Sequence, residues 1–210
     1  MNLRALSHSF TAMCDWLMKL AYLNGLWLLF TACGVLVFGW APATAALHSV
    51  LRKLRDPTKE VAIFREFAHV YKQNFFKATG IGTMFVLGIG ALLVSYVGLV
   101  TMAAPLLMRF MFLSVACFYV IMSVFLFPVL ISSRCRTFSV FKLSFLYGVG
   151  HLHYAVIGIV FVFGFFFLSL TIPTVGIFFG ISLPAWFVCQ LFVKMEEGEK
   201  VQVGGVRKVA

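Results

Sequence analysis

The sequence has 210 residues, of which 62% are hydrophobic and only 11% are charged. A soluble domain would carry about 25% charged residues, so this composition excludes a soluble globular protein. The formal charge of +10 comes from 17 Lys and Arg against 7 Asp and Glu, and we attribute it to cytoplasmic loops facing anionic lipid headgroups. No basic stretch is interleaved with aromatic residues, so we expect no nucleic-acid partner. The composition predicts one all-α integral membrane domain over residues 1–210.

Long apolar runs predict the membrane spans. The hydrocarbon core of a bilayer needs about 20 apolar residues in a helix. Five segments reach that length, and they are 21–40, 79–100, 107–131, 154–172 and 175–194. Only Pro173 and Thr174 separate the last two segments, so these should form a tight helical hairpin. Pro184 and Gln190 indicate a kink in the fifth.

The basic residues predict the orientation of these spans. Fourteen of the 17 Lys and Arg fall on one side, in the stretches 52–77, 134–142 and 194–208. Because loops rich in Lys and Arg remain in the cytoplasm, we expect a multi-pass protein of the cell membrane. We expect its N-terminus outside and its C-terminus in the cytoplasm.

Amphipathic stretches flank the spans, and we expect interfacial helices at 3–20, 43–55 and 62–78. The alternative is that these stretches extend the transmembrane helices into water. In the second stretch, Arg52, Lys53 and Arg55 face mostly away from the apolar stripe. They form a candidate surface for a partner or for lipid. His48 and His69 lie on these basic segments and are expected to be solvated or to face lipid.

The segment from 39 to 57 has two incompatible interpretations. Ala43-Thr44-Ala45 resembles a signal-peptidase site after an apolar run, whereas Pro42 is suited to the first turn of a new helix. The basic residues lie downstream of the apolar run, which is the wrong arrangement for a signal peptide. We therefore expect Pro42 to turn the chain into the interfacial helix, with Trp40 in the aromatic belt.

Side-chain chemistry points away from catalysis. The spans contain almost no ionisable residue, and none of the seven acidic residues forms a pair suited to acid–base work. The five cysteines include no CxxC spacing, and His151 and His153 are the only close histidine pair. We expect no enzyme activity, no catalytic residue, no cofactor and no metal.

Several motifs resemble those of the YesL-like bacterial membrane proteins, a domain-of-unknown-function family of low-GC Gram-positive bacteria. The similar segments are LNGLWLL (23–29), FGWAPATAAL (38–47), VLRK (50–53) and the run from Phe67 to Lys77. The resemblance implies an integral membrane protein, often encoded beside carbohydrate ABC importers, and no established reaction. Shared structural demands are expected at Asn24 and at Pro42 to Leu47, which includes Thr44. Asn24 should bond to a neighbouring helix or to a headgroup.

Two functions remain in competition. The first is a non-enzymatic accessory component of carbohydrate ABC uptake, with permease or ATPase subunits as partners besides the anionic bilayer. The second is a small channel or facilitator for neutral solutes, which would need no buried charge. A liposome flux assay and copurification with mass spectrometry would separate them.

Overall fold

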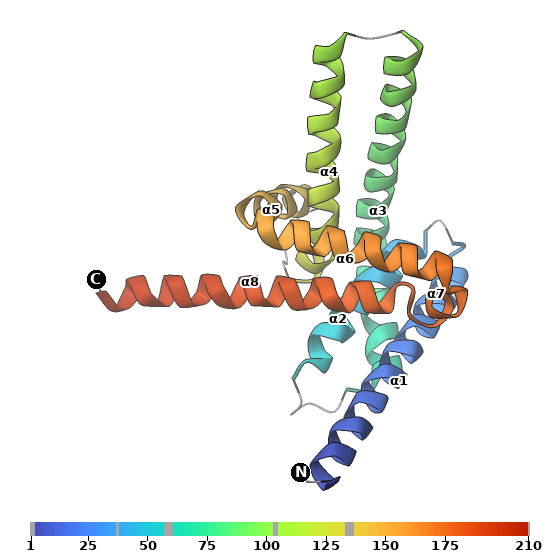
Figure 1. Ribbon diagram of the computed structural model, residues 1–210, viewed down its shortest axis with the longest axis vertical. Coiled ribbons are helices and arrows are strands. Elements are labelled where there is room, and N and C mark those ends of the chain that lie inside the picture. The colour runs from blue at the N-terminus through green and yellow to red at the C-terminus, as the bar shows by residue number, and fades with distance from the viewer. Residues whose placement is uncertain (1–2, 37, 57–60, 103–104, 133–136, 210) are drawn as a thin grey trace.

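The computed structural model is all-helical over the residues it describes, which are 3–36, 38–56, 61–102, 105–132 and 137–209. Its helices, shown in Figure 1, are α1 (Leu3–Cys33), α2 (Trp40–Leu54), α3 (Ile63–Thr101), α4 (Leu106–Ser132), α5 (Thr137–Gly150), α6 (Leu152–Thr171), α7 (Pro173–Phe179) and α8 (Ser182–Val209). Four of them are long and apolar enough to cross a membrane, or five if the bent pair α7–α8 is one span. The prediction of an all-α membrane protein is confirmed.

Helix α2 forms the centre of the fold. It packs against α1, α3, α4 and α8, and every residue from Ala41 to Leu51 except Thr44 is buried. The expected interfacial helix 43–55 is therefore present, but protein rather than lipid covers it as far as Leu51, and only its last turn is partly exposed. One buried face of α2 is its apolar stripe, which includes Leu47, Val50 and Leu51. Ala41, Ala45 and Ser49 lie elsewhere on the helix, where their small side chains let other helices approach closely.

The chain turns between α1 and α2 before it reaches Pro42. Val35 and Leu36 adopt left-handed backbone conformations, with φ of 58° and 55°. A Cβ on Gly34 would lie 2.3 Å from the Cα of Gly39, so glycine is required at this crossing of the chain. Pro42 lies within the first turn of α2, where a missing backbone N–H leaves no bond unmade. The turn therefore depends on the two glycines, and Pro42 only begins the next helix.

Helices α1 and α3 are longer than the spans expected from hydropathy. The stretches 3–20 and 62–78 are not separate helices, because each continues without a break into the apolar segment that follows it. This is the alternative interpretation, in which spans extend beyond the hydrocarbon. At 39 residues, α3 is about 58 Å long for a rise of 1.5 Å per residue.

The C-terminal half contains a helical hairpin with a broken second arm. Helices α6 and α8 lie side by side, and α7 connects them at one end (Figure 1). The axes of α7 and α8 differ by 57°. The expected kink is present, but it falls at Gly180 and Ile181, ahead of Pro184. Helix α5 has 14 residues, too few to span the bilayer, and it was not among the expected elements.

Helices α3 and α4 form a second hairpin, which extends away from the rest of the molecule (Figure 1). None of the most apolar 18-residue stretch of α3 is buried. Large apolar side chains such as Leu87, Val94 and Met111 are 64–74% exposed on it. In a membrane chain these side chains meet acyl chains or another membrane protein.

Candidate functional site

Asn24 on α1 holds the break between α7 and α8 together. Its side chain is only 3% exposed. The amide Nδ2 donates to the carbonyl oxygen of Ile177 at 2.7 Å, while Oδ1 accepts from the backbone N–H groups of Ile181 and Ser182 at 3.2 and 3.4 Å. Backbone groups at interrupted helix ends must find partners inside a membrane. Asn24 supplies them on both sides of the break, so it makes the helix-to-helix bond that its position predicted.

Thr44 connects the other members of the sequence motif. Its hydroxyl accepts a hydrogen bond from Trp27 Nε1 at 3.0 Å and donates one to the carbonyl oxygen of Trp40 at 2.7 Å. The half-buried indole of Trp40 packs edge-on against Phe127, with ring centroids 5.7 Å apart. Pro42 is fully buried. The motif residues thus connect α2 to α1 and α4, and these contacts give a structural reason for the side chains found in this segment.

A cavity of about 780 Å³ lies beside the α7–α8 break. Its walls come from α1, α2, α4, α6, α7 and α8 and are predominantly apolar, whereas its polar lining consists of Asn24, Trp27, Thr44, His48, Ser123 and Ser169. No Asp, Glu, Lys or Arg of the described chain lines it. This volume is in the range of about 300–1,000 Å³ typical of small-molecule sites.

His48 is the most unusual of the polar lining residues. It is 6% exposed, its Nδ1 has no hydrogen-bond partner within the described part of the chain, and its ring stacks parallel to Phe127. Burial lowers the pKa of His48 from 6.5 to about 4, so the ring is neutral at pH 7. The expectation of a solvated or lipid-facing His48 is wrong, because α2 is interior. His69 on α3 is exposed as expected.

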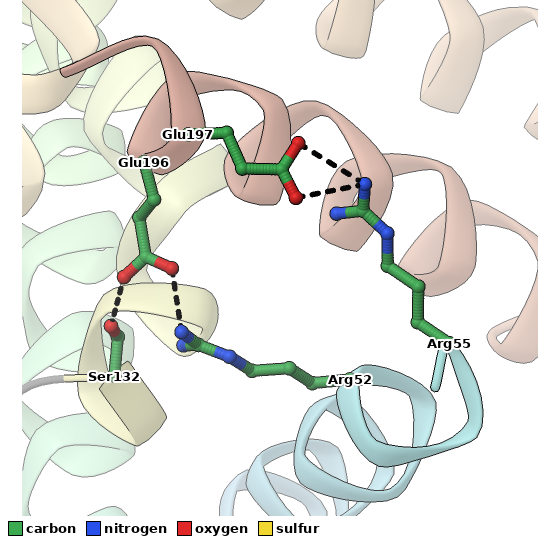
Figure 2. Close-up of polar contacts among 5 residues, drawn as sticks. All are labelled: Arg52, Arg55, Ser132, Glu196 and Glu197. Carbon is green, nitrogen blue, oxygen red and sulfur yellow. Dashed lines mark hydrogen bonds and ion pairs between the residues drawn. The ribbon is translucent and has the colours of Figure 1, made fainter. Parts of the chain in front are cut away.

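The basic end of α2 is held by two acidic side chains of α8, one of which also contacts a hydroxyl of α4. Arg52 pairs with Glu196 at 2.5 Å and Arg55 with Glu197 at 3.1 Å, and the Ser132 hydroxyl also donates to Glu196 (Figure 2). We call these five residues the charged clamp. It joins α2, α4 and α8 into one unit.

The candidate surface of Arg52, Lys53 and Arg55 is consequently not a free basic face. Lys53 also pairs, with Glu66 of α3 at 2.6 Å. A lipid headgroup or partner protein would have to compete with three internal carboxylates. Sequence spacing does not reveal these pairs, because Glu196 lies 144 residues after Arg52.

The cavity and the charged clamp share one ridge of α2. Thr44, His48, Arg52 and Arg55 follow i, i+4, i+8, i+11 spacing, so they lie one above another along the helix. The first two line the cavity and the last two reach α8. The arrangement is suited to ligand binding. Within the described residues, no group of three His, Cys, Asp or Glu could hold a metal ion.

These features define a polytopic α-helical membrane protein with a cavity among its helices that no charged side chain of the described residues lines. The model of a family described as "Protein of unknown function, DUF624" matches residues 20–96, the part that carries Asn24, Thr44 and His48. The chain is 32% identical to the uncharacterized protein YteU of Bacillus subtilis (strain 168) over 203 residues. The alignment covers 93% of this chain and 91% of YteU.

Two further Bacillus subtilis (strain 168) proteins are similar to this chain. YesV is 50% identical over 72 residues, 34% of this chain and 35% of YesV. YesL is 30% identical over 132 residues, 63% of each chain. The chain belongs to this YesL-like family of unknown function. No solved structure matches it.

Proposed function

We propose that the protein is a non-enzymatic accessory component of carbohydrate uptake by an ABC importer, and that it acts by assembling with another membrane protein. The link to carbohydrate importers rests on the resemblance of the sequence motifs. The observation that supports assembly is the hairpin of α3 and α4, which extends from the body with apolar side chains exposed along it.

One face of α3 combines three small residues with the exposed side chains of Leu87 and Val94, so it offers both close approach and side-chain contacts to a second helix. Gly80, Ala91 and Gly98 lie within about 20° of one another around the helix for 100° per residue. A Cβ added to Gly80 or Gly98 would meet nothing within 4 Å. Small residues let a second transmembrane backbone approach closely, which drives association where apolar burial gives no net gain. The uncovered face therefore supports docking of a partner's transmembrane helix.

Copurification from native membranes tests this proposal. We expect permease or ATPase subunits of a carbohydrate ABC importer to be enriched over unrelated membrane proteins. The triple substitution of Gly80, Ala91 and Gly98 by Leu should abolish that enrichment. Gly164→Leu on α6 is the matched control, because a Cβ there also meets nothing within 4 Å. Equal recovery of importer and unrelated proteins would contradict the proposal.

A second candidate is a facilitator for neutral solutes. The observation in its favour is the uncharged cavity beside a broken helix, since discontinuous helices line the substrate sites of many transporters. Liposomes that contain the protein should then take up neutral sugars faster than empty vesicles. Uptake equal to that of empty vesicles would remove this candidate.

The proposed orientation has the N-terminus outside and the C-terminus in the cytoplasm of the bacterial cell. It is supported by the excess of Lys and Arg in the stretches 52–77, 134–142 and 194–208. An epitope tag at the N-terminus should be digested by protease added to intact spheroplasts, whereas a C-terminal tag should be protected. The reverse pattern would overturn the orientation.

A further inference from the structure

The cavity beside the α7–α8 break opens onto the apolar outer surface. Four lining residues, Leu28, Phe163, Phe166 and Ile177, are also 49–65% exposed. The lining therefore passes from the interior to a surface formed by α1, α6 and α7. In a membrane chain such a surface meets acyl chains, so a ligand can enter sideways from the bilayer without crossing water.

The buried end of the cavity carries one hydrogen-bonding group that the protein leaves unused. Asn24 and Thr44 are already bonded to backbone and side-chain partners. His48 differs, because its Nδ1 is enclosed by protein atoms and has no partner in the described residues, which leaves Nε2 as the ring nitrogen through which a ligand in the cavity can reach His48. An unsatisfied buried polar group is unfavourable. A ligand hydroxyl can donate or accept, so it can pair with a neutral imidazole in either tautomer.

The absence of charge in the lining restricts the head group. No carboxylate, ammonium or guanidinium of the described chain lines the cavity. A carboxylate or phosphate head would therefore be desolvated without a counter-charge, which is strongly unfavourable. Because burial holds His48 neutral at pH 7, the ring does not supply that counter-charge. An uncharged head with a hydroxyl is what remains.

We infer that this cavity binds an uncharged single-chain amphiphile of the monoacylglycerol type. The ligand enters from the bilayer, its head hydroxyl pairs with His48, and its acyl chain lies against the apolar walls of α4 and α6, which include Val124 and Ile159. A volume of about 780 Å³ suits one chain with a small head. The site does not depend on the proposed accessory role, since it requires neither a partner nor solute flux.

Photolabelling of the full-length protein in phosphatidylcholine nanodiscs tests the inference. The probe is a monoacylglycerol with a diazirine in its acyl chain. We expect saturable labelling in α4, α6 and α7, competed by glycerol monooleate. Oleate, lysophosphatidylglycerol and dioleoylglycerol in equal excess should compete much less.

Two matched pairs of variants locate the site. Ser123→Trp fills the cavity from α4 and should abolish saturable labelling, whereas Ser114→Trp on the exposed part of the same helix should not. His48→Leu should weaken the affinity about three- to tenfold, the loss of one hydrogen bond. His69→Leu on the exposed face of α3 should leave it unchanged. Gel filtration and thermal unfolding verify that each variant is folded.

Three results would overturn the inference. Labelling that does not saturate, or that persists in folded Ser123→Trp, removes the site. Competition by oleate or lysophosphatidylglycerol as strong as that by glycerol monooleate refutes an uncharged head, and equal competition by dioleoylglycerol refutes a single chain. Each result is independent of the copurification experiment. If the accessory role is refuted, the ligand site is unaffected, and if the ligand site is refuted, the accessory role is unaffected.

Discussion

Glu196→Gln is the substitution that most directly tests the charged clamp. Glu196 is 15% exposed and its partner Arg52 35% exposed, so the pair lies between a surface ion pair and a buried one. Exposed pairs contribute about 0–1 kcal/mol, while breaking a fully buried pair costs about 3–5 kcal/mol. We expect Glu196→Gln to lower the free energy of unfolding by about 2 kcal/mol. Most of this loss comes from leaving Arg52 half-buried without its carboxylate.

The neighbouring pair supplies the control. Glu197 is 58% exposed, so Glu197→Gln should cost only about 0.5 kcal/mol. Thermal unfolding in detergent can be followed by tryptophan fluorescence, because Trp40 lies on α2 and Trp186 on α8, two of the three helices that the clamp joins. The expected fall in Tm is about 4–8 °C for Glu196→Gln and about 1–2 °C for Glu197→Gln. High salt should remove the smaller effect and retain most of the larger.

A double-mutant cycle assigns the effect to the pair. Arg52→Gln, Glu196→Gln and the double variant should give a coupling energy of about 1–2 kcal/mol. If the two single effects simply add, Glu196 acts on something other than Arg52. If Glu196→Gln is no more destabilising than Glu197→Gln, burial does not strengthen this clamp and the reasoning fails.

Three further predictions concern α1, the α1–α2 turn and α2. Asn24→Leu removes the three bonds to the α7–α8 break and should lower the free energy of unfolding by about 2–4 kcal/mol; a loss below about 0.5 kcal/mol in thermal unfolding would contradict that role. Gly34→Ala brings a Cβ within 2.3 Å of the Gly39 Cα and should destabilise strongly, whereas Gly90→Ala meets open space and should be neutral or stabilising; similar Tm values would argue against the close crossing. Burial lowers the pKa of His48 from 6.5 to about 4, so the unfolded chain takes up the proton first as pH falls. Stability should be level above pH 6.5, fall by at most about 3 kcal/mol between pH 6.5 and 4, and lose this component in His48→Gln; an identical pH profile in wild type and variant would refute it.

Hydropathy alone located the helices whose apolar runs are long and bounded by breaks. Residues 107–131 and 154–172 correspond closely to α4 (Leu106–Ser132) and α6 (Leu152–Thr171). The division at Thr79 is wrong, because no proline interrupts α3 and its basic half, which ends at Lys77, continues as one helix into the apolar half. An amphipathic pattern reveals which side of a helix is apolar. It does not reveal where the helix ends.

The candidate site was harder to anticipate because it combines residues distant in the sequence. Asn24 was identified as a bonding residue, but its partners at Ile177 and Ser182 follow from a helix break that hydropathy does not locate. His48 resembled a surface histidine because basic residues follow it on α2. His48 is buried because the faces of α2 that carry alanine and serine also pack against other helices. These small residues do not form an apolar pattern that could be recognised in the sequence. Local patterns identify which residues need a partner, whereas the fold determines which partner they meet.

The position of α2 has a consequence for how the protein is made. Arg52 emerges from the ribosome 144 residues before Glu196, which corresponds to about 7–30 s at synthesis rates of about 5–20 residues per second. During that interval the central helix has no clamp, and the wall that α8 adds to the cavity is missing. A chain truncated before α8 keeps Arg52 and Arg55 without these carboxylates, so synthesis of α8 is the step that pairs the two guanidinium groups and adds the last wall of the cavity.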